Sequence, residues 1–289
     1  VKVTGNVDMD VYGNGVTVIG ENSTVTIAKG GSITVPTGTN YGYYALAAYD
    51  KGTINMNANG DANTVKLDGD IFATKGSTIN LGLVTTDSYL NGIIDNGGTA
   101  NITLKNGAKW NNVANNRRYT QDNEDKGDDE RSHVSLLNGG TNFDDAGTIV
   151  QNANSKLLYI GKLDGTVKVN YECDVLDNSI ENSVTINSAA GDSKIALFTK
   201  NSGIDTGDQD AIDAVLNALA NKLYYNAYVT GERNLTGIAV GIGEGITASS
   251  VQKQADIKFD EVYGQGSLTG EVGEGTGINP DFGEEEGSK

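Results

Sequence analysis

A serine that follows a glycine and an aspartate, together with the one histidine of the chain, is the first combination that could perform chemistry. Ser193 lies in the stretch SAAGDSKIAL (188–197), and a serine becomes a nucleophile when a neighbouring base removes its proton. His133 is the only histidine that could be that base. In a glycine-rich nucleophile segment the serine is followed by glycine, but here it is followed by Lys194. We therefore expect this stretch to be a turn between two strands.

Paired carboxylates are the second candidate, because two of them flank the scissile bond in most glycosidases. Asp8 and Asp10 form one pair, and Asp68 and Asp70 form the other. Residues i and i+2 of a strand point to the same side, about 6–7 Å apart, which is near the separation that glycosidases use. Gly69 marks a turn, however, and acids are commonly solvated in a chain of net charge −17. We therefore expect all four carboxylates to be exposed to solvent.

The stretch DTGDQD (205–210) places three carboxylates within six residues, as a calcium-binding loop does. It lacks the central glycine and the distal glutamate of an EF-hand loop. Acidic residues are also favoured at the start of a helix, where they interact with the unpaired backbone N–H groups. We expect helix capping here, and neither a metal nor another cofactor in the protein.

Two clusters favour recognition instead of catalysis. The stretch TNYGYYALAAYDKG (39–52) is rich in tyrosine, which combines a large contact area with a polar tip. An insert at 115–132 is dense in charge and has no strand pattern, and such inserts in repeat proteins form loops that often bind partners. The candidate ligand-binding residues are Tyr41, Tyr43, Tyr44, Tyr49, Arg117, Arg118 and Tyr119. The alternatives are an aromatic stack inside the fold and a merely solvated loop, and we expect Trp110 to pack in the core.

Composition limits the class of protein. The chain has 289 residues, 39 of them glycine and only 2 proline, with 37 % hydrophobic residues. This suits many short strands joined by glycine-rich turns. Its 38 acidic residues against 21 basic ones repel polyphosphates, so nucleic acid and anionic membranes are not expected as partners. The single cysteine, Cys173, excludes an intrachain disulfide, and we expect it to be a small buried apolar residue.

A repeated phrase indicates the architecture that positions these residues. KGTIN (51–55) returns as KGSTIN (75–80), and short runs that alternate apolar with polar residues continue along the chain. The expected core positions, one per repeat, are Ile33, Ile54, Ile79, Ile102, His133–Val134, Leu157–Leu158 and Ile186. A strand-only period of this length predicts an all-β right-handed parallel β-helix, a solenoid whose coils share one core. A β-propeller is the competing repeat fold, but its Trp-Asp and kelch signatures are absent.

One segment has a helical period instead. Ile212, Val215, Leu216, Leu219 and Leu223 are spaced as on one face of a helix within 205–225, which Asp205 or Thr206 could cap. A helix near the end of a solenoid can cover the open core of the last coil. We expect β-helical coils in 1–204, the capping helix with further strands in 205–266, and an acidic Gly/Glu-rich linker or tail in 267–289.

The order of several phrases resembles the passenger region of autotransporters, in the pertactin-like class. The resemblance covers roughly residues 70–265. Its phrases are NGGTANITLKNGAKWNN (96–112), SHVSLLNGGTN (132–142), SKLLYIGKLDGTVKVNY (155–171) and LANKLYYNAYVTGERNLTGIAVGIGEGITASSVQKQADIKFDE (219–261). Serine-protease members of this class carry their nucleophile in an N-terminal domain, whereas Ser193 lies late in this chain.

The resemblance implies a right-handed parallel β-helix displayed on the surface of a diderm bacterium and attached in its precursor to an outer-membrane β-barrel. It also implies that the last coils assist secretion. The function expected from it is that of a non-enzymatic adhesin, which binds proteins or glycans on host or bacterial cells during colonisation. Two alternatives remain: a polysaccharide hydrolase or lyase on the same fold, and a structural stem whose recognition surface lies elsewhere.

Overall fold

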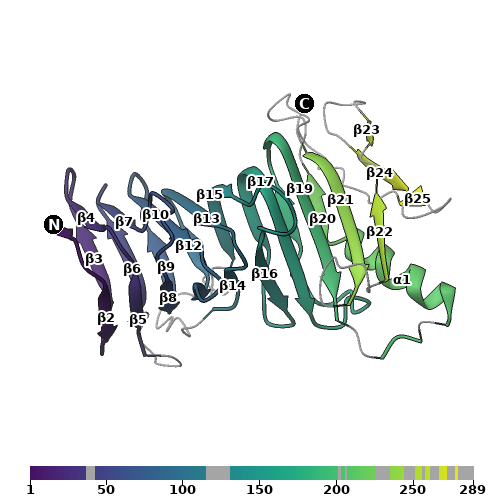
Figure 1. Ribbon diagram of the computed structural model, residues 1–289, viewed down its shortest axis with the longest axis horizontal. Coiled ribbons are helices and arrows are strands. Elements are labelled where there is room, and N and C mark those ends of the chain that lie inside the picture. The colour runs from purple at the N-terminus through teal and green to yellow at the C-terminus, as the bar shows by residue number, and fades with distance from the viewer. Residues whose placement is uncertain are drawn as a thin grey trace.

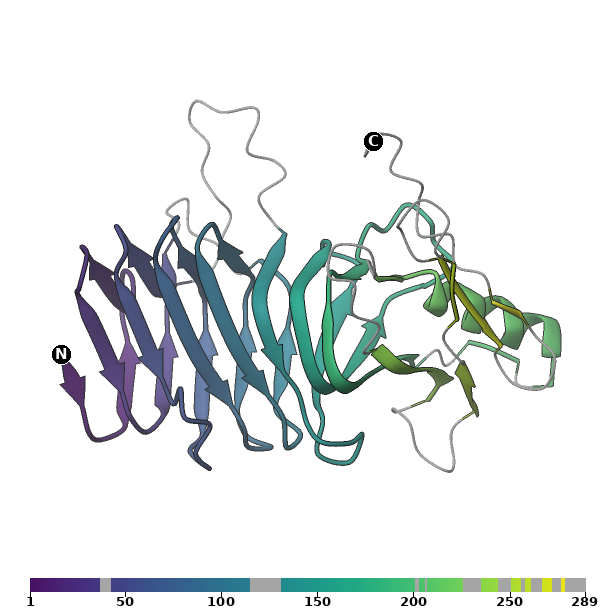
Figure 2. The same cartoon turned by 90° about the horizontal axis from the view of Figure 1, so that it is seen from above.

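The computed structural model describes residues 1–36, 43–114, 131–200, 203–205, 207–225, 235–243, 251–255, 258–260, 267–271 and 277–278. Most of these residues lie in β-strands, and one α-helix is present among them. The strands lie side by side along an elongated body, with the N-terminus at one end (Figure 1). The view from above shows that each strand crosses the long axis of the body and that the strands are arranged one after another along it (Figure 2).

Strands of the N-terminal half fall into three sets. Each of the first eleven strands pairs in parallel with the strand three places further along the chain, and the thirteenth and fourteenth each pair with the strand two places further along. The first set is β1 (Lys2–Val3), β4 (Thr24–Ile27), β7 (Thr53–Met56), β10 (Thr78–Leu83), β13 (Thr99–Leu104) and β15 (Ser132–Asn138). The second set is β2 (Val7–Asp10), β5 (Gly31–Thr34), β8 (Val65–Asp68), β11 (Tyr89–Asn91), β14 (Lys109–Asn111) and β16 (Gly147–Asn152). The third set is β3 (Val16–Ile19), β6 (Tyr44–Tyr49), β9 (Asp70–Ala73) and β12 (Ile94–Asn96).

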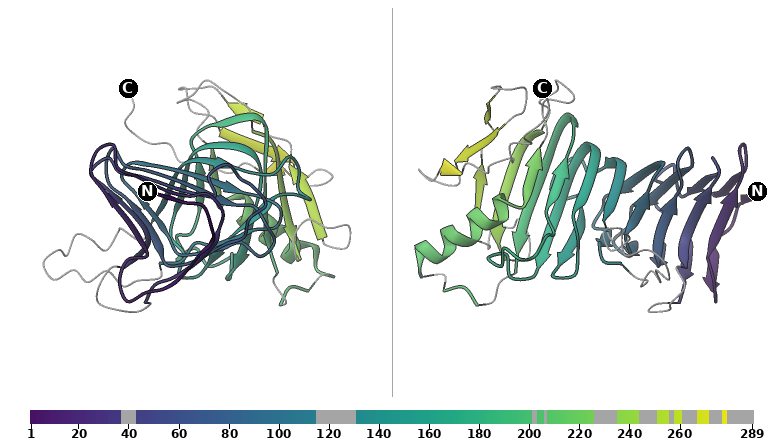
Figure 3. Two further views of the ribbon diagram at one scale, coloured as in Figure 1. Left: turned by 60° about the vertical axis from the view of Figure 1, so that its left-hand side comes forward. Right: turned by 180° about the vertical axis from the view of Figure 1, so that it is seen from behind.

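Longer strands continue the first two sets in the C-terminal half. β17 (Leu158–Glu172) pairs with β15 through its first half and with β16 through its second half. The strands that follow are β18 (Val184–Ile186), β19 (Ala189–Thr199), β20 (Leu223–Tyr225) and β21 (Leu235–Ile242), all in parallel pairs. We call one successive group of strands, such as β4, β5 and β6, a coil. The described residues therefore form an all-β, parallel, solenoid-like fold, and Figure 3 (left) shows the successive coils behind one another.

The repeated phrase of the sequence stacks on itself. Thr53, Ile54 and Asn55 of β7 pair directly with Thr78, Ile79 and Asn80 of β10. Inward-facing residues form columns through the body, and one of these columns is Val3, Ile27, Met56, Leu81, Ile102, Leu137, Leu163 and Ala189. From Ile27 onward every member of this column is buried, so a single continuous core runs the length of the solenoid.

Of the expected core equivalences between successive repeats, Ile54 with Ile79 is confirmed and the others are wrong. Val134 and Ile186 both pair with Ile160, and Leu158 pairs with Ser132 and Val184. Ile102 pairs with Leu81 and Leu137 and not with Ile79, because β10 and β13 each carry three inward-facing apolar positions that the sequence pattern does not distinguish. Ile33 is buried, but it belongs to the second strand set and pairs with Leu67. Trp110 is fully buried as expected, and its indole Nε1 donates to the carbonyl of Gly92 at 2.8 Å.

The predicted helix is present as α1 (Gln209–Ala220), at the end of the body opposite the N-terminus (Figures 1 and 2). Ile212, Val215, Leu216 and Leu219 are buried and join the core, as their spacing predicts. The cap differs from the expectation: the carboxylate of Asp208, and not that of Asp205, accepts from the first backbone N–H groups. Thr206 lies outside the described residues. Leu223 is buried, but it belongs to β20.

Short antiparallel strands follow the parallel body. β22 (Val251–Ala255) pairs with β21, and β23 (Lys258–Asp260), β24 (Ser267–Glu271) and β25 (Gly277–Ile278) form a small separate sheet. Two of these strands lie in 267–289, where the sequence showed no regular pattern. Among the helical residues that the structure describes, no segment is long and apolar enough to cross a membrane.

Candidate binding surfaces

Ser193 is a structural residue inside β19. Its side chain is fully buried, and the hydroxyl donates to the carbonyls of Leu163 and Ala190 while it accepts from Gly165 N at 3.1 Å. The register between β17 and β19 shifts at this point, so the segment is an irregularity within a strand and not the expected turn between two strands.

His133 has different partners. Its Nδ1 lies 3.3 Å from the carbonyl oxygen of Asn96, and its ring meets that of Tyr159 edge-on, with centroids 4.9 Å apart. Ser193 and His133 therefore have different hydrogen-bond partners, and the described contacts do not pair them as nucleophile and base.

The two carboxylate pairs differ in their surroundings. Asp8 and Asp10 are both exposed on the same side of β2, as predicted, and Asp8 accepts from Ser32 Oγ at 2.6 Å. Asp68 ends β8 and Asp70 begins β9, with Gly69 at a φ of +154° between them, so this pair spans a corner of the coil.

The expected exposure of the second pair is wrong. Asp70 is only 2 % exposed, and its Oδ1 accepts from Ile93 N of the next coil at 2.9 Å. Asp68 is half-buried, and its two oxygens accept from Tyr89 and Asn91. These carboxylates hold neighbouring coils together.

The acidic stretch before α1 makes local hydrogen bonds. Asp205 accepts from Gly207 N at 2.9 Å, and Asp208 accepts from Asp210 N at 3.0 Å and Ala211 N at 3.3 Å. Across the described part of the chain, no three His, Cys, Asp or Glu side chains come together as a metal site would require. The chemistry that this stretch performs is therefore helix capping.

Aromatic side chains gather on the third strand set. Tyr44 and Tyr49 begin and end β6, and Phe72 lies in the next strand of this set, β9. The rings of Tyr44 and Phe72 are stacked, with centroids 4.8 Å apart and an interplanar angle of 19°. The ring of Tyr49 lies 5.3 Å from that of Phe72, tilted by 50°. We call these three residues the aromatic platform.

The register shows that the platform faces outward. Phe72 pairs with Ala47 and alternates with Ile71 and Ala73, which belong to the core. All three platform rings are half-buried, so part of each remains accessible. Burial raises the pKa of the Tyr49 hydroxyl, so this group stays a neutral donor and acceptor at neutral pH.

The platform corrects the expected tyrosine cluster in part. Tyr44 and Tyr49 are brought together through Phe72, which the sequence argument missed, whereas Tyr43 packs against the core. The signal for Phe72 was its place in DGDIFA (68–73), one coil after YALAAY, but it depends on knowing the register. Tyr41, Arg117, Arg118 and Tyr119 lie outside the described residues.

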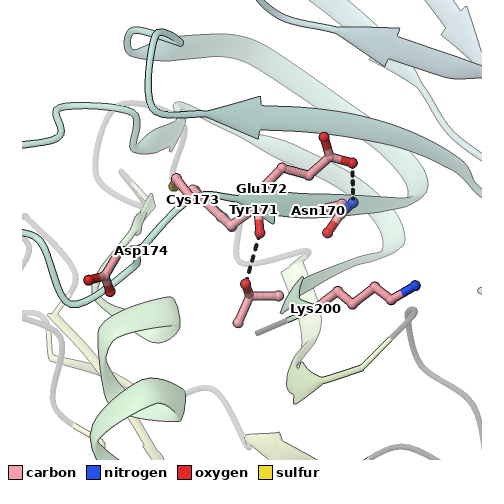
Figure 4. A pocket seen from close by; sticks show the side chains of 7 residues that line it. Asn170, Tyr171, Glu172, Cys173, Asp174 and Lys200 are labelled. Atoms are coloured by element: carbon pink, nitrogen blue, oxygen red, sulfur yellow. Dashed lines mark hydrogen bonds between the residues drawn. The ribbon is translucent and has the colours of Figure 1, made fainter. Parts of the chain in front are cut away.

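A pocket lies where β17 and β19 end. The pocket has a volume of about 480 Å³ and is lined by Asn170, Tyr171, Glu172, Cys173, Asp174, Thr199 and Lys200. Asn170 Nδ2 donates to Glu172 Oε1 at 3.1 Å (Figure 4). The hydroxyl of Thr199 donates to the Tyr171 carbonyl at 2.8 Å. These bonds tie the pocket wall together.

Cys173 lines this pocket and is half-buried, so the expected full burial is wrong. It packs against the core, and its Sγ accepts from Asn182 Nδ2 at 3.3 Å. Lys222 donates to the carbonyl of Ile180 at 2.8 Å, and burial lowers the pKa of its ammonium while Cys173 and Asp177 oppose that effect.

Comparison with protein-family models, with curated proteins and with solved structures finds no match to this chain. The candidate sites therefore have to be assessed from their own geometry.

Proposed function

We propose that this protein is an adhesin-type autotransporter passenger: a right-handed parallel β-helix, displayed outside a diderm bacterium, that binds molecules on host or bacterial cells. Its precursor carries an outer-membrane β-barrel, and the helix α1 with the last coils assists secretion. The proposal is supported by the parallel, solenoid-like arrangement and by the order of sequence phrases that resembles such passengers.

The observation that carries the binding role is the outward-facing aromatic platform. Tyr44, Tyr49 and Phe72 span two adjacent strands of a rigid sheet, so their rings are held in place before any ligand arrives. Rigid aromatic side chains supply a large contact area at a low entropic cost, and they dominate many binding interfaces. A platform of this kind suits the flat apolar face of a sugar ring or an apolar side chain of a surface protein.

A glycan and extracellular-matrix array tests this function. We expect saturable binding without product formation, and a loss of about tenfold or more in the Phe72→Ala variant, since a central aromatic anchor typically contributes more than 1 kcal/mol. Tyr159→Ala is the matched control, because Tyr159 is a half-buried aromatic residue that contacts His133 on a different strand set.

Both variants should keep the circular dichroism spectrum of the parent. Equal binding by Phe72→Ala and the parent protein would overturn the assignment of the platform. Release of reducing sugar from an array glycan would overturn the non-enzymatic function.

A further inference from the structure

The register of the second strand set assembles a column of side chains that are distant in the sequence. Lys66 pairs with Tyr89, Tyr89 with Lys109, Lys109 with Thr148, and Thr148 with Lys168. These five residues lie on the five successive strands β8, β11, β14, β16 and β17, and we call them the lysine column.

The column faces away from the core. The neighbours of its members along each strand, such as Leu67, Leu90 and Trp110, are fully buried. Side chains alternate between the two faces of a strand, so the column members point outward. Lys66 and Lys109 are exposed, while the other three are half-buried.

The charge of the column is opposite to that of the protein. The chain has 38 acidic and 21 basic residues, yet three of these five positions are lysine. Among the described residues, no carboxylate forms an ion pair with Lys66 or Lys109. Lys168 contributes less to the positive charge of the column, because burial lowers the pKa of its ammonium and only the nearby Asp144 opposes that effect.

Beyond Lys66 the same register continues to Ser32 and then to Asp8, so the basic part of this face begins at Lys66. Two residues further along each strand lie Asp68, Asn91, Asn111, Val150 and Asn170. The one carboxylate among them, Asp68, accepts from Tyr89 OH at 2.8 Å and from Asn91 Nδ2 at 2.6 Å. The column therefore presents the ammonium groups of Lys66 and Lys109 beside the three amides Asn91, Asn111 and Asn170, which can bind sugar hydroxyls.

Spacing limits the ligand. Neighbouring strands lie about 4.8 Å apart, so lysines on alternate strands are about 10 Å apart along the axis of the solenoid. That is close to the repeat of an extended disaccharide. Tyr89 lies between Lys66 and Lys109, and its hydroxyl is held by Asp68, so its ring can contact a sugar between two charged contacts.

We propose that the lysine column binds an extended acidic polysaccharide that carries one carboxylate per disaccharide and runs along the axis of the solenoid. A nucleic acid fits less well, because its dense phosphate charge would meet the acidic remainder of a chain with net charge −17. The column belongs to a different strand set from the aromatic platform, so this inference does not rest on the proposed adhesin function.

Binding of hyaluronan oligosaccharides, which alternate a uronate with an N-acetylhexosamine, tests the proposal. The test variant is Lys66→Gln/Lys109→Gln. The matched control is Lys75→Gln/Lys162→Gln, which removes the same charge from exposed lysines outside the column. We expect the test variant to bind about tenfold more weakly and with a smaller dependence on salt, since two exposed charge contacts are lost.

Chito-oligosaccharide of equal length and single-stranded DNA are the ligand controls, and neither should bind as well as hyaluronan. All substituted lysines are exposed, so the variants should keep the parent's melting temperature within a few degrees. The proposal is overturned if the parent protein does not bind hyaluronan, if both double variants lose binding equally, or if DNA binds more tightly.

Discussion

The hydroxyl of Tyr89 donates to Oδ2 of Asp68 at 2.8 Å, across two neighbouring strands of the solenoid. The second oxygen of Asp68 accepts from Asn91, which lies two residues after Tyr89 on the same strand. One carboxylate on β8 is thus bound by two side chains of β11. Contacts of this kind connect each coil to the next on the outside of the body, where the apolar core cannot do so.

This bond makes the protein sensitive to alkaline pH. Burial, and then the hydrogen bond and charge of Asp68, raise the pKa of Tyr89 to about 12 from 10.0. The neutral phenol is favoured in the folded state, so its contribution to stability is complete below pH 10 and is lost as the pH rises towards 12. Because Tyr89 is only half-buried and solvent screens its interaction with Asp68, we expect this contribution to be only about 1 kcal/mol.

The measurement is the free energy of unfolding by denaturant at pH 8, 10 and 11.5 for the parent protein and Tyr89→Phe. The parent should lose stability more steeply between the two higher values, because the variant has no phenol to ionise at this position. Parallel pH profiles for the two proteins would contradict the assigned pKa.

A ladder of asparagines performs a similar role on the first strand set. Asn80 Nδ2 donates to Asn55 Oδ1 at 2.7 Å, and Asn101 Nδ2 donates to Asn80 Oδ1 at 2.8 Å. Asn80→Ala removes both bonds and leaves two half-buried amides with fewer partners, so we expect a loss of about 1–3 kcal/mol. Asn178→Ala, at an exposed turn position, should change stability by less than about 0.5 kcal/mol. Equal urea midpoints for the two variants would show that the ladder does not stabilise the fold.

The close approach of two strands at Gly31 gives a third prediction. Gly31 has a φ of +132°, and a Cβ atom there would lie 1.9 Å from the carbonyl oxygen of Val7, its partner on β2. Gly31→Ala must therefore move β5 away from β2, and we expect a loss of about 2–3 kcal/mol. Gly13→Ala is the control, because a Cβ atom at Gly13 would have no neighbour within 4 Å. A melting temperature of Gly31→Ala equal to that of the control would contradict the register of β2 and β5.

The sequence was sufficient for features that depend on short-range pattern. The phrase shared by Thr53 and Thr78 predicted that the two segments are equivalent, and they pair directly because each coil repeats the same turn and strand. The helical spacing of Ile212 to Leu219 likewise predicted the buried face of α1. The precise cap was not predictable, because several acidic residues precede the helix and only the local backbone conformation selects Asp208.

Features that depend on register between coils were not predictable. The sequence predicts that Asp70 is a solvated acid, but the corner at Gly69 turns its side chain towards the backbone N–H of Ile93 in the next coil. The lysine column also had a weak signal, since VKLD (65–68), AKWN (108–111) and VKVN (167–170) share a lysine two residues before an acid or amide. Only the pairing of the strands shows that these lysines lie in one line.

The buried hydroxyl of Tyr171 yields the last prediction. Tyr171 is 1 % exposed, and its hydroxyl has no hydrogen-bond partner among the described residues, although Thr199 Oγ1 donates to its backbone carbonyl at 2.8 Å. Burial, and to a lesser degree Cys173, raise the pKa of the phenol far above its usual value, so the group stays neutral. A buried hydroxyl without a partner has lost its hydration and gained nothing in return.

Tyr171→Phe should therefore keep the stability of the parent or increase it by about 1 kcal/mol, because phenylalanine fills the same space without the hydroxyl. Thr199→Val, at the neighbouring position, should lower stability by about 1–2 kcal/mol, because it breaks a buried hydrogen bond while it preserves the volume. Denaturant unfolding of the two variants in parallel measures both effects. A clear loss of stability in Tyr171→Phe would mean that the hydroxyl has a partner in solution, for which a bound water in the adjoining pocket is the simplest candidate.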